Sequence, residues 1–217
     1  MAEETTPESI HPLRDVWLRP RRVVRELADT PITRIDYLLG ITQGIVSWLS
    51  LSRAQSAGTS STVAQILARA ALAGPIAGVL GLYLMSAVYT RLARRAGGSA
   101  TRAQIFHVLA YSGVPMIASL GIWLLTAALA GRATFLNGPP ADLQPFLALL
   151  VRAQFLSHVL LVGWSLLLQV MAFSEAERLP TSRAFGVWLL GQVLVMLAIL
   201  LLWILVIGFG VSPLPST

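Results

Sequence analysis

Five long stretches that are almost free of charge constrain the fold of this chain more than any other feature. They cover residues 36–52, 63–90, 104–131, 146–173 and 184–211, and their only charged members, Asp36, Arg69 and Arg152, lie near an end. Bilayer hydrocarbon is about 30 Å thick, which takes about 20 mostly apolar residues of helix to cross. Only helices and closed barrels satisfy the backbone in lipid. We therefore expect an all-α polytopic membrane protein, a bundle of five transmembrane helices.

Composition agrees with this interpretation. Of the 217 residues, 55% are hydrophobic and 12% are charged, whereas about a quarter are charged in soluble domains. The polar stretches between the spans are too short for a second domain. We expect three regions: a cytoplasmic N-terminal segment with an interfacial helix (1–35), a five-span transmembrane domain (36–211) and a short outer tail (212–217). The acidic first residues contain no apolar run, so no cleaved signal peptide is expected.

Arginine supplies all 16 basic residues, and its distribution predicts the orientation. Six arginines precede the first span, four lie between the second and third spans, and two lie between the fourth and fifth. The other connections and their flanks carry Arg53, Arg69, Arg132 and Arg152. The positive-inside rule places the N-terminus in the cytoplasm and the C-terminus outside. The absence of lysine beside abundant alanine, leucine and glycine indicates a bacterial source, hence an inner (plasma) membrane.

A short helix is expected before the first span. Pro20 suits a first helical turn, and Trp17, Val23, Val24 and Leu27 supply apolar side chains. Such a helix can lie in the head-group plane with arginine on phosphate, although a solvated basic linker or a docking site for a protein partner would have the same sequence. Contact with anionic lipid is expected, rather than with nucleic acid. The arginines expected to contact head groups are Arg19, Arg21, Arg22, Arg25, Arg94 and Arg95.

Small residues predict where the first two spans pack. Gly40 and Gly44 are four apart in the first span, and Gly74 and Gly78 are four apart in the second. Helices in lipid associate mainly through close backbone approach, which such spacing permits. We expect these glycines to pack helices within the chain, with a self-association face as the alternative.

The third span contains a helix breaker. Pro115 removes one backbone N–H and crowds the carbonyl of Tyr111, so the helix should bend there and leave an acceptor for a hydroxyl, water or neighbouring helix. The small residues Ser112 and Gly113 leave room for that repair. His107, Tyr111 and Pro115 share one face, which should point into the bundle.

The fourth span carries a polar stripe. Gln154, His158, Ser165 and Gln169 fall within about 60° on a helical wheel and, with His107, form a candidate buried polar seam. Ionisable groups at this depth are functional candidates, so His158 could respond to protons or bind a ligand. The simpler interpretation is a neutral histidine bonded to Gln154 or to the third span.

Sequence signatures of catalysis are missing. The chain has no H-E-x-x-H, no G-x-S-x-G, no Walker loop and no cysteine. Its three histidines and four aspartates are scattered rather than grouped with the spacing of a metal site. We expect no enzymatic activity, no metal and no cofactor.

Two short motifs resemble a known family. W-x-x-P at Trp17–Pro20, followed by RRVVREL, and A-Y-S-G-V-P-M at 110–116 are similar to elements of the Yip (Ypt-interacting protein) family of five-span membrane proteins, in its bacterial branch. That family carries tyrosine-serine-x-x-proline in its third span, so the resemblance implies an architectural role for Tyr111, Ser112 and Pro115. Eukaryotic relatives are linked to vesicle traffic and prenylated Rab-type GTPases. This chain lacks their Asp-Leu-Tyr-Gly-Pro element, so GTPase binding is not implied.

The resemblance and the residues together predict a non-catalytic membrane protein with a membrane-organising or partner-binding role. Its expected partners are membrane lipids, other membrane proteins or a second copy of the chain. The alternative is a small transporter or channel subunit that uses the polar seam around His158.

Overall fold

The computed structural model describes residues 11–210, apart from the side chains of 199, 202, 203 and 205–210. The expected outer tail, 212–217, lies outside the described residues. Two short 3-10 turns, η1 (Ala57–Thr59) and η2 (Gly131–Phe135), accompany the α-helices. The α-helices are α1 (Pro12–Asp15), α2 (Pro20–Leu27), α3 (Arg34–Ala54), α4 (Val63–Arg95), α5 (Arg102–Ser112), α6 (Val114–Ala130), α7 (Pro145–Glu177) and α8 (Thr181–Gly210).

Local sequence signals set the helix ends. α4 and α5 each begin with a reciprocal capping box, in which a threonine hydroxyl and a glutamine side chain satisfy backbone N–H groups. α2 and α7 begin with a proline, whose missing N–H would have no partner there anyway. α4 is followed by Gly97 with φ of 89°, a left-handed conformation that favours glycine. The sequence therefore encodes most of these boundaries locally.

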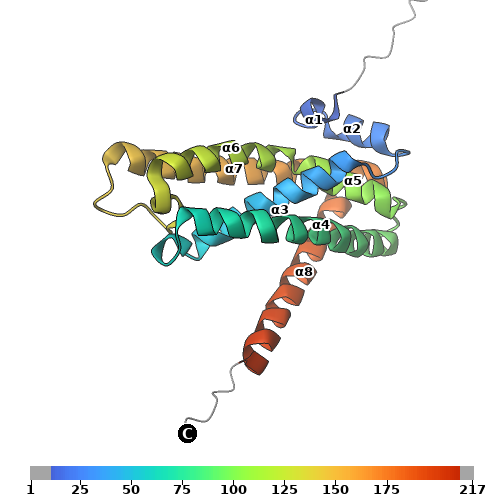
Figure 1. The fold of residues 1–217 in the computed structure, drawn as a ribbon. Coiled ribbons are helices and arrows are strands. Elements are labelled where there is room, and N and C mark those ends of the chain that lie inside the picture. The colour runs from blue at the N-terminus through green and yellow to red at the C-terminus, as the bar shows by residue number, and fades with distance from the viewer. Residues whose placement is uncertain (1–10, 211–217) are drawn as a thin grey trace, which may run out of the picture.

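The helices α3, α4, α6 and α7 run alongside one another as an elongated bundle, with α1 and α2 lying over the end near α5 (Figure 1). α8 starts at that same end and leaves the bundle at an angle (Figure 1). Its first turns are held by Trp188, whose Nε1 donates to Gln169 Oε1 of α7 over 2.8 Å. Gly191 then faces the ring of Tyr89 on α4.

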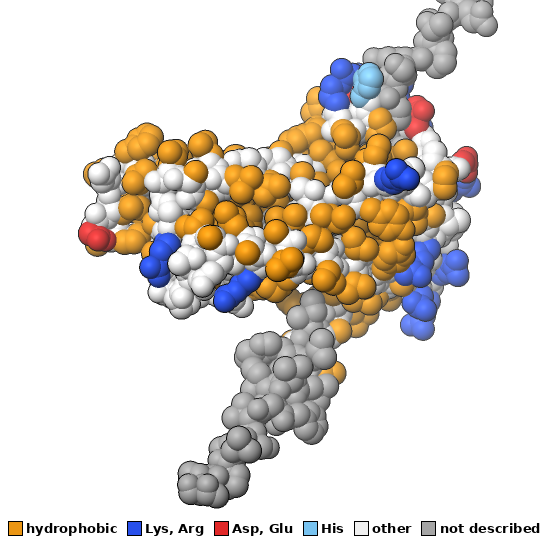
Figure 2. All heavy atoms as spheres, in the orientation of Figure 1, with side chains coloured by type: hydrophobic (Ala, Val, Ile, Leu, Met, Phe, Trp, Pro, Cys, Tyr) orange, Lys and Arg blue, Asp and Glu red, His pale blue; other side chains and the backbone are white. Residues whose placement is uncertain are grey.

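The lengths and surfaces of the helices are those of a multi-pass membrane protein. Within the described residues, four helical stretches are long and apolar enough to cross a bilayer: α4, Arg102–Phe135, α7 and the Thr181–Ala198 part of α8. Large apolar side chains such as Leu72, Leu160 and Met196 are exposed on them, which suits contact with lipid rather than water. Apolar side chains cover the middle of the bundle, with arginines towards its ends (Figure 2). α3 is not among these four.

α3 and α4 approach each other through their glycines. A Cβ at Gly44 would overlap the carbonyl oxygen of Gly74, and one at Gly78 would overlap that of Gly40. The four glycines therefore lie at a contact within the chain, where backbone meets backbone. Gly81, also on α4, faces open space.

One element differs from the sequence expectation, and a second was left open by the sequence. The bend placed at Pro115 is a full interruption at Gly113, which separates α5 from α6 and leaves Pro115 in the first turn of α6. In α2, Val23 and Val24 are buried in the core that also contains residues of α5 and α7, whereas the sequence left a lipid interface, a solvated linker and a docking site open. The apolar surface that contacts these valines therefore belongs to the protein itself.

Candidate functional site

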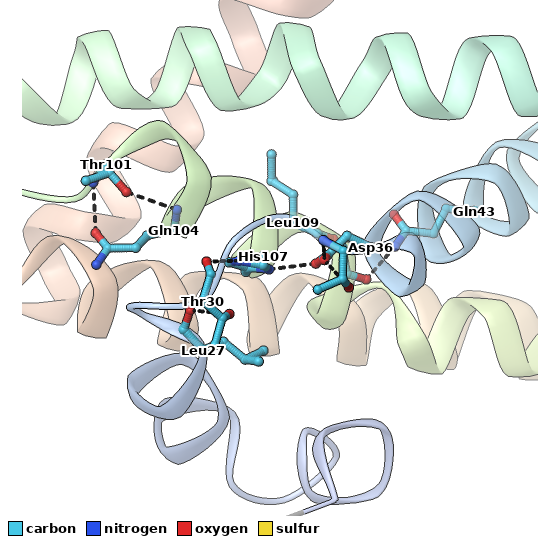
Figure 3. A network of polar contacts seen from close by, with 10 residues as sticks. Leu27, Thr30, Asp36, Gln43, Thr101, Gln104, His107 and Leu109 are labelled. Carbon is cyan, nitrogen blue, oxygen red and sulfur yellow. Dashed lines mark hydrogen bonds and ion pairs between the residues drawn. The ribbon is translucent and has the colours of Figure 1, made fainter.

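A buried pair, Asp36 and His107, joins α3 to α5 near the end covered by α2 (Figure 3). Asp36 Oδ2 accepts from the backbone N–H and hydroxyl of Thr33, which caps α3, and Asp36 Oδ1 lies 2.6 Å from His107 Nδ1. His107 Nε2 lies 3.2 Å from the carbonyl oxygen of Thr30. Both ring nitrogens face oxygen acceptors, a geometry that the doubly protonated imidazolium satisfies in full.

The same region ties the N-terminal segment to the bundle. Gln104, on α5, donates from Nε2 to the carbonyl oxygen of Ala28 over 3.0 Å and also caps its own helix at Thr101 (Figure 3). Thr30 Oγ1 donates to Leu27 O, closing the chain after α2. The connection between α2 and α3 is therefore bound to α5 at two points, Ala28 and Thr30.

Side chains of neighbouring helices satisfy the backbone groups that the α5–α6 break leaves free. Gln43 Nε2, on α3, donates to the carbonyl oxygen of Ala110 over 2.7 Å. Ser165 Oγ, on α7, accepts from the backbone N–H of Met116 over 3.1 Å. A Cβ at Gly113 would overlap the Gln43 amide, so glycine leaves the room for that contact. A neighbouring helix thus donates to a carbonyl at the break, but that carbonyl belongs to Ala110 and not to Tyr111, the residue expected from the position of Pro115.

His158 lies between three helices. Its Nε2 lies 2.8 Å from Ser50 Oγ on α3, and its Nδ1 lies 3.2 Å from Ser119 Oγ and 3.4 Å from Trp123 Nε1 on α6. An indole N–H can only donate, so Nδ1 accepts and the proton sits on Nε2, which donates to Ser50. This is the arrangement of a neutral histidine.

The candidate polar seam is not one connected set. Gln154 bonds to Arg53 on α3, Ser165 to the backbone of α6, and Gln169 to Trp188 on α8. His107 lies on α5 and bonds towards α3. These side chains therefore take part in separate contacts between helices, and each forms hydrogen bonds that hold two helices together inside an apolar bundle.

The family-motif residues lie in or beside the packed core. Tyr111, Ser112 and Pro115 are buried around the α5–α6 break, and Pro20 is buried at the start of α2. Trp17 packs against the same core while partly exposed. All five positions therefore lie in or against the packed core, and their architectural role stays a prediction.

The arginines expected to contact lipid lie at the α2 end of the bundle. Arg25 pairs with Glu175 of α7 over 3.2 Å, Arg21 Nη2 donates to Thr181 Oγ1 over 3.1 Å, and Arg22 lies 3.7 Å from Glu26. Arg94 and Arg95 are exposed at the end of α4. We call this surface the arginine-rich end; it comprises Arg19, Arg21, Arg22, Arg25, Arg94 and Arg95.

Sequence patterns missed three of the residues that organise these contacts: Asp36 as the partner of His107, Gln43 at the break and Arg53 beside Gln154. The position of each residue along its span, and hence its depth in the membrane, would have identified two of these pairs. Asp36 and His107 each lie within the first four residues of their spans, and these two spans begin on the same side of the membrane. Arg53 lies just after the end of the first span and Gln154 in the first part of the fourth span, which are both on the other side. Gln43 had no such signal, because its partners are backbone carbonyls.

A family model described as Yip1 domain matches residues 14–209 of the chain, which is most of its length. No curated protein and no solved structure gives a match.

Proposed function

The chain belongs to the Yip1 domain family of membrane proteins, and on that premise we propose that it is a non-catalytic, five-span protein of a bacterial inner membrane that organises anionic lipid around its arginine-rich end. α3, with 21 residues, supplies the fifth span beside the four apolar stretches. The distribution of arginine supports a cytoplasmic N-terminus and an outer C-terminus.

The observation that carries the proposal is the attachment of α2. Val23 and Val24 are buried in the core, and Arg25 pairs with Glu175 across to α7. The arginines of α2 therefore have fixed positions at this end, and Arg94 and Arg95 add exposed positive charge at the end of α4. Each arginine held near an anionic membrane surface contributes about 1 kcal/mol of attraction.

Transport through a seam around His158 has no specific support. The polar side chains of α7 contact three different helices, and the hydrogen bonds of His158 go to Ser50, Ser119 and Trp123. A transport path would instead need polar groups that face a shared space across the bundle.

A lipid-enrichment measurement tests the proposal. The chain contains no cysteine, so one donor dye can be attached at Ser99→Cys, an exposed position between α4 and α5. In vesicles that hold a small fraction of acceptor-labelled phosphatidylglycerol or phosphatidylcholine, energy transfer should be higher to phosphatidylglycerol. The triple variant Arg91→Gln, Arg94→Gln, Arg95→Gln removes the exposed arginines at the end of α4, two of which belong to the arginine-rich end, and should lower the excess.

The matched control is Arg152→Gln, an exposed arginine at the other end of the bundle, which should keep the excess. Equal transfer to both lipids in the unmodified chain would contradict the proposal. An excess that is unchanged in the triple variant would contradict the contribution of the α4 arginines to this surface.

A further inference from the structure

A cavity beside Arg53, at the end of the bundle away from α2, contains a buried positive charge. The cavity has a volume of about 180 Å³. We call it the Arg53 cavity; it is lined by Ser50, Arg53, Ala54, Trp123, Asn137, Phe155 and His158. Arg53 itself is only 8% exposed.

The contacts of Arg53 within the described part of the chain are all neutral. Nη1 donates to Gln154 Oε1 over 2.6 Å and faces Val151 O at 3.5 Å, and the guanidinium carbon lies 4.8 Å from the centre of the Phe155 ring. No described carboxylate lies within ion-pair distance, and no hydrogen bond to a described residue uses Nε or Nη2. A buried charge without a counter-charge is strongly unfavourable.

The surrounding chain offers little to neutralise Arg53. Residues 37–174 contain one acidic side chain, Asp142, which is exposed in the loop before α7. Three more arginines, Arg69, Arg132 and Arg152, belong to the same end. This end of the molecule therefore carries excess positive charge around a cavity with unused donors.

We propose that the Arg53 cavity binds the phosphodiester group of an anionic glycerophospholipid. The free Nε and Nη2 donors of Arg53 form the planar fork that matches two phosphate oxygens. Asn137 lines the same cavity, and its side-chain amide makes no hydrogen bond within the described residues. Liquid water occupies about 30 Å³ per molecule, so the cavity has room for a phosphate group with a few waters.

The position of the cavity favours a lipid over a free anion. Arg53 is the penultimate residue of α3, and Phe155, which covers its guanidinium, is 46% exposed on the apolar surface of α7. A ligand held there has its acyl chains against that surface. None of the described residues that line the cavity carries a carboxylate for an ammonium group, so an anionic head group fits better than a zwitterionic one.

Native mass spectrometry of the full chain in detergent tests the site. The probes are phosphatidylglycerol, phosphatidylethanolamine and inorganic phosphate at equal concentrations. Arg53→Gln and Asn137→Asp should each weaken phosphatidylglycerol binding about tenfold or more, because a charge-assisted contact is lost or opposed. Arg152→Gln, at the same end but outside the cavity, should bind as the unmodified chain does. Asn137 lies in an exposed loop, so its variant keeps the test valid if Arg53→Gln does not fold.

Three results would overturn the proposal: phosphatidylglycerol binding that is unchanged in Asn137→Asp and in folded Arg53→Gln, equal binding of phosphatidylethanolamine, or inorganic phosphate that displaces the lipid at equal concentration. The last would indicate a site for a free anion. None of these results bears on the arginine-rich end, whose test uses other residues.

Discussion

Asp36 Oδ1 lies 2.6 Å from His107 Nδ1, in a contact where neither side chain is more than 2% exposed. The pair links the first turn of α3 to α5, and it connects through Thr30 to the segment that carries α2. One buried contact thus fixes the relative position of three parts of the chain.

A double-mutant cycle on this pair should give a coupling free energy of about 1–3 kcal/mol, because each single variant removes one of the two groups whose charges strengthen the hydrogen bond. The variants are Asp36→Asn, His107→Gln and the double variant, compared by their free energies of unfolding in detergent. A coupling below about 0.5 kcal/mol would mean that the two side chains act independently.

The glycine contact between α3 and α4 predicts a contrast within one helix. Gly78→Ala should destabilise the protein by about 1–3 kcal/mol, because its Cβ would overlap the backbone of α3. Gly81→Ala adds the same methyl group to α4 where nothing lies within 4 Å, and it should be neutral or stabilising by up to about 1 kcal/mol. Unfolding temperatures measure both, and equal effects would contradict the packing described.

The repair of the α5–α6 break predicts that Gln43 is needed for stability. Gln43→Leu leaves the Ala110 carbonyl oxygen without its 2.7 Å donor, which should cost about 1–3 kcal/mol. Ser47→Ala, one turn further along α3 at an exposed position, is the control and should change the free energy of unfolding by less than about 0.5 kcal/mol. A Gln43→Leu variant as stable as this control would show that the carbonyl has another partner.

The rate of proteolysis at the arginines of α2 measures whether α2 is packed on the bundle. Val23→Asp should release α2, because Val23 is 0% exposed and a buried charge is strongly unfavourable. Trypsin should then cleave at Arg19 to Arg25 faster than in the unmodified chain. Leu18→Asp makes the same kind of change at a residue that is 83% exposed, and it should leave the cleavage rate unchanged. Equal rates in the two variants would indicate that α2 is not held on the bundle.

Because His158 is neutral and both of its ring nitrogens have hydrogen-bond partners, we expect it to transport neither protons nor small ions. Reconstituted vesicles should show background flux of protons and small ions with both the unmodified chain and His158→Leu. A flux above background that falls in His158→Leu would favour the transporter alternative.

The sequence predicts the helical membrane fold well, because the features that determine it lie within short segments of the chain. Long apolar stretches must be helical in lipid, and prolines and threonines mark several of the helix starts. Pro115 predicts a bend in the third span, whereas the structure has a full break at Gly113, where Gln43 and Ser165 satisfy the freed backbone groups. Those partners come from helices that no short-range pattern identifies.

The contacts of the polar residues were less predictable. A helical wheel places Gln154, His158 and Gln169 on one stripe, but it does not show which helix each side chain meets. Likewise, an amphipathic helix such as α2 buries its valines equally well in a membrane interface or on a protein surface. Tertiary packing decides between these, and the sequence left the alternatives open for Val23, which the structure buries in the protein core.

We propose that the chain crosses the membrane five times. Because the chain contains no cysteine, single cysteines at Ser9 and Ser216 can be probed in intact cells with a membrane-impermeant maleimide. Labelling at Ser216→Cys from outside, with Ser9→Cys labelled only after the membrane is opened, is the predicted result. Both positions labelled in the same compartment would mean an even number of crossings and would contradict the account.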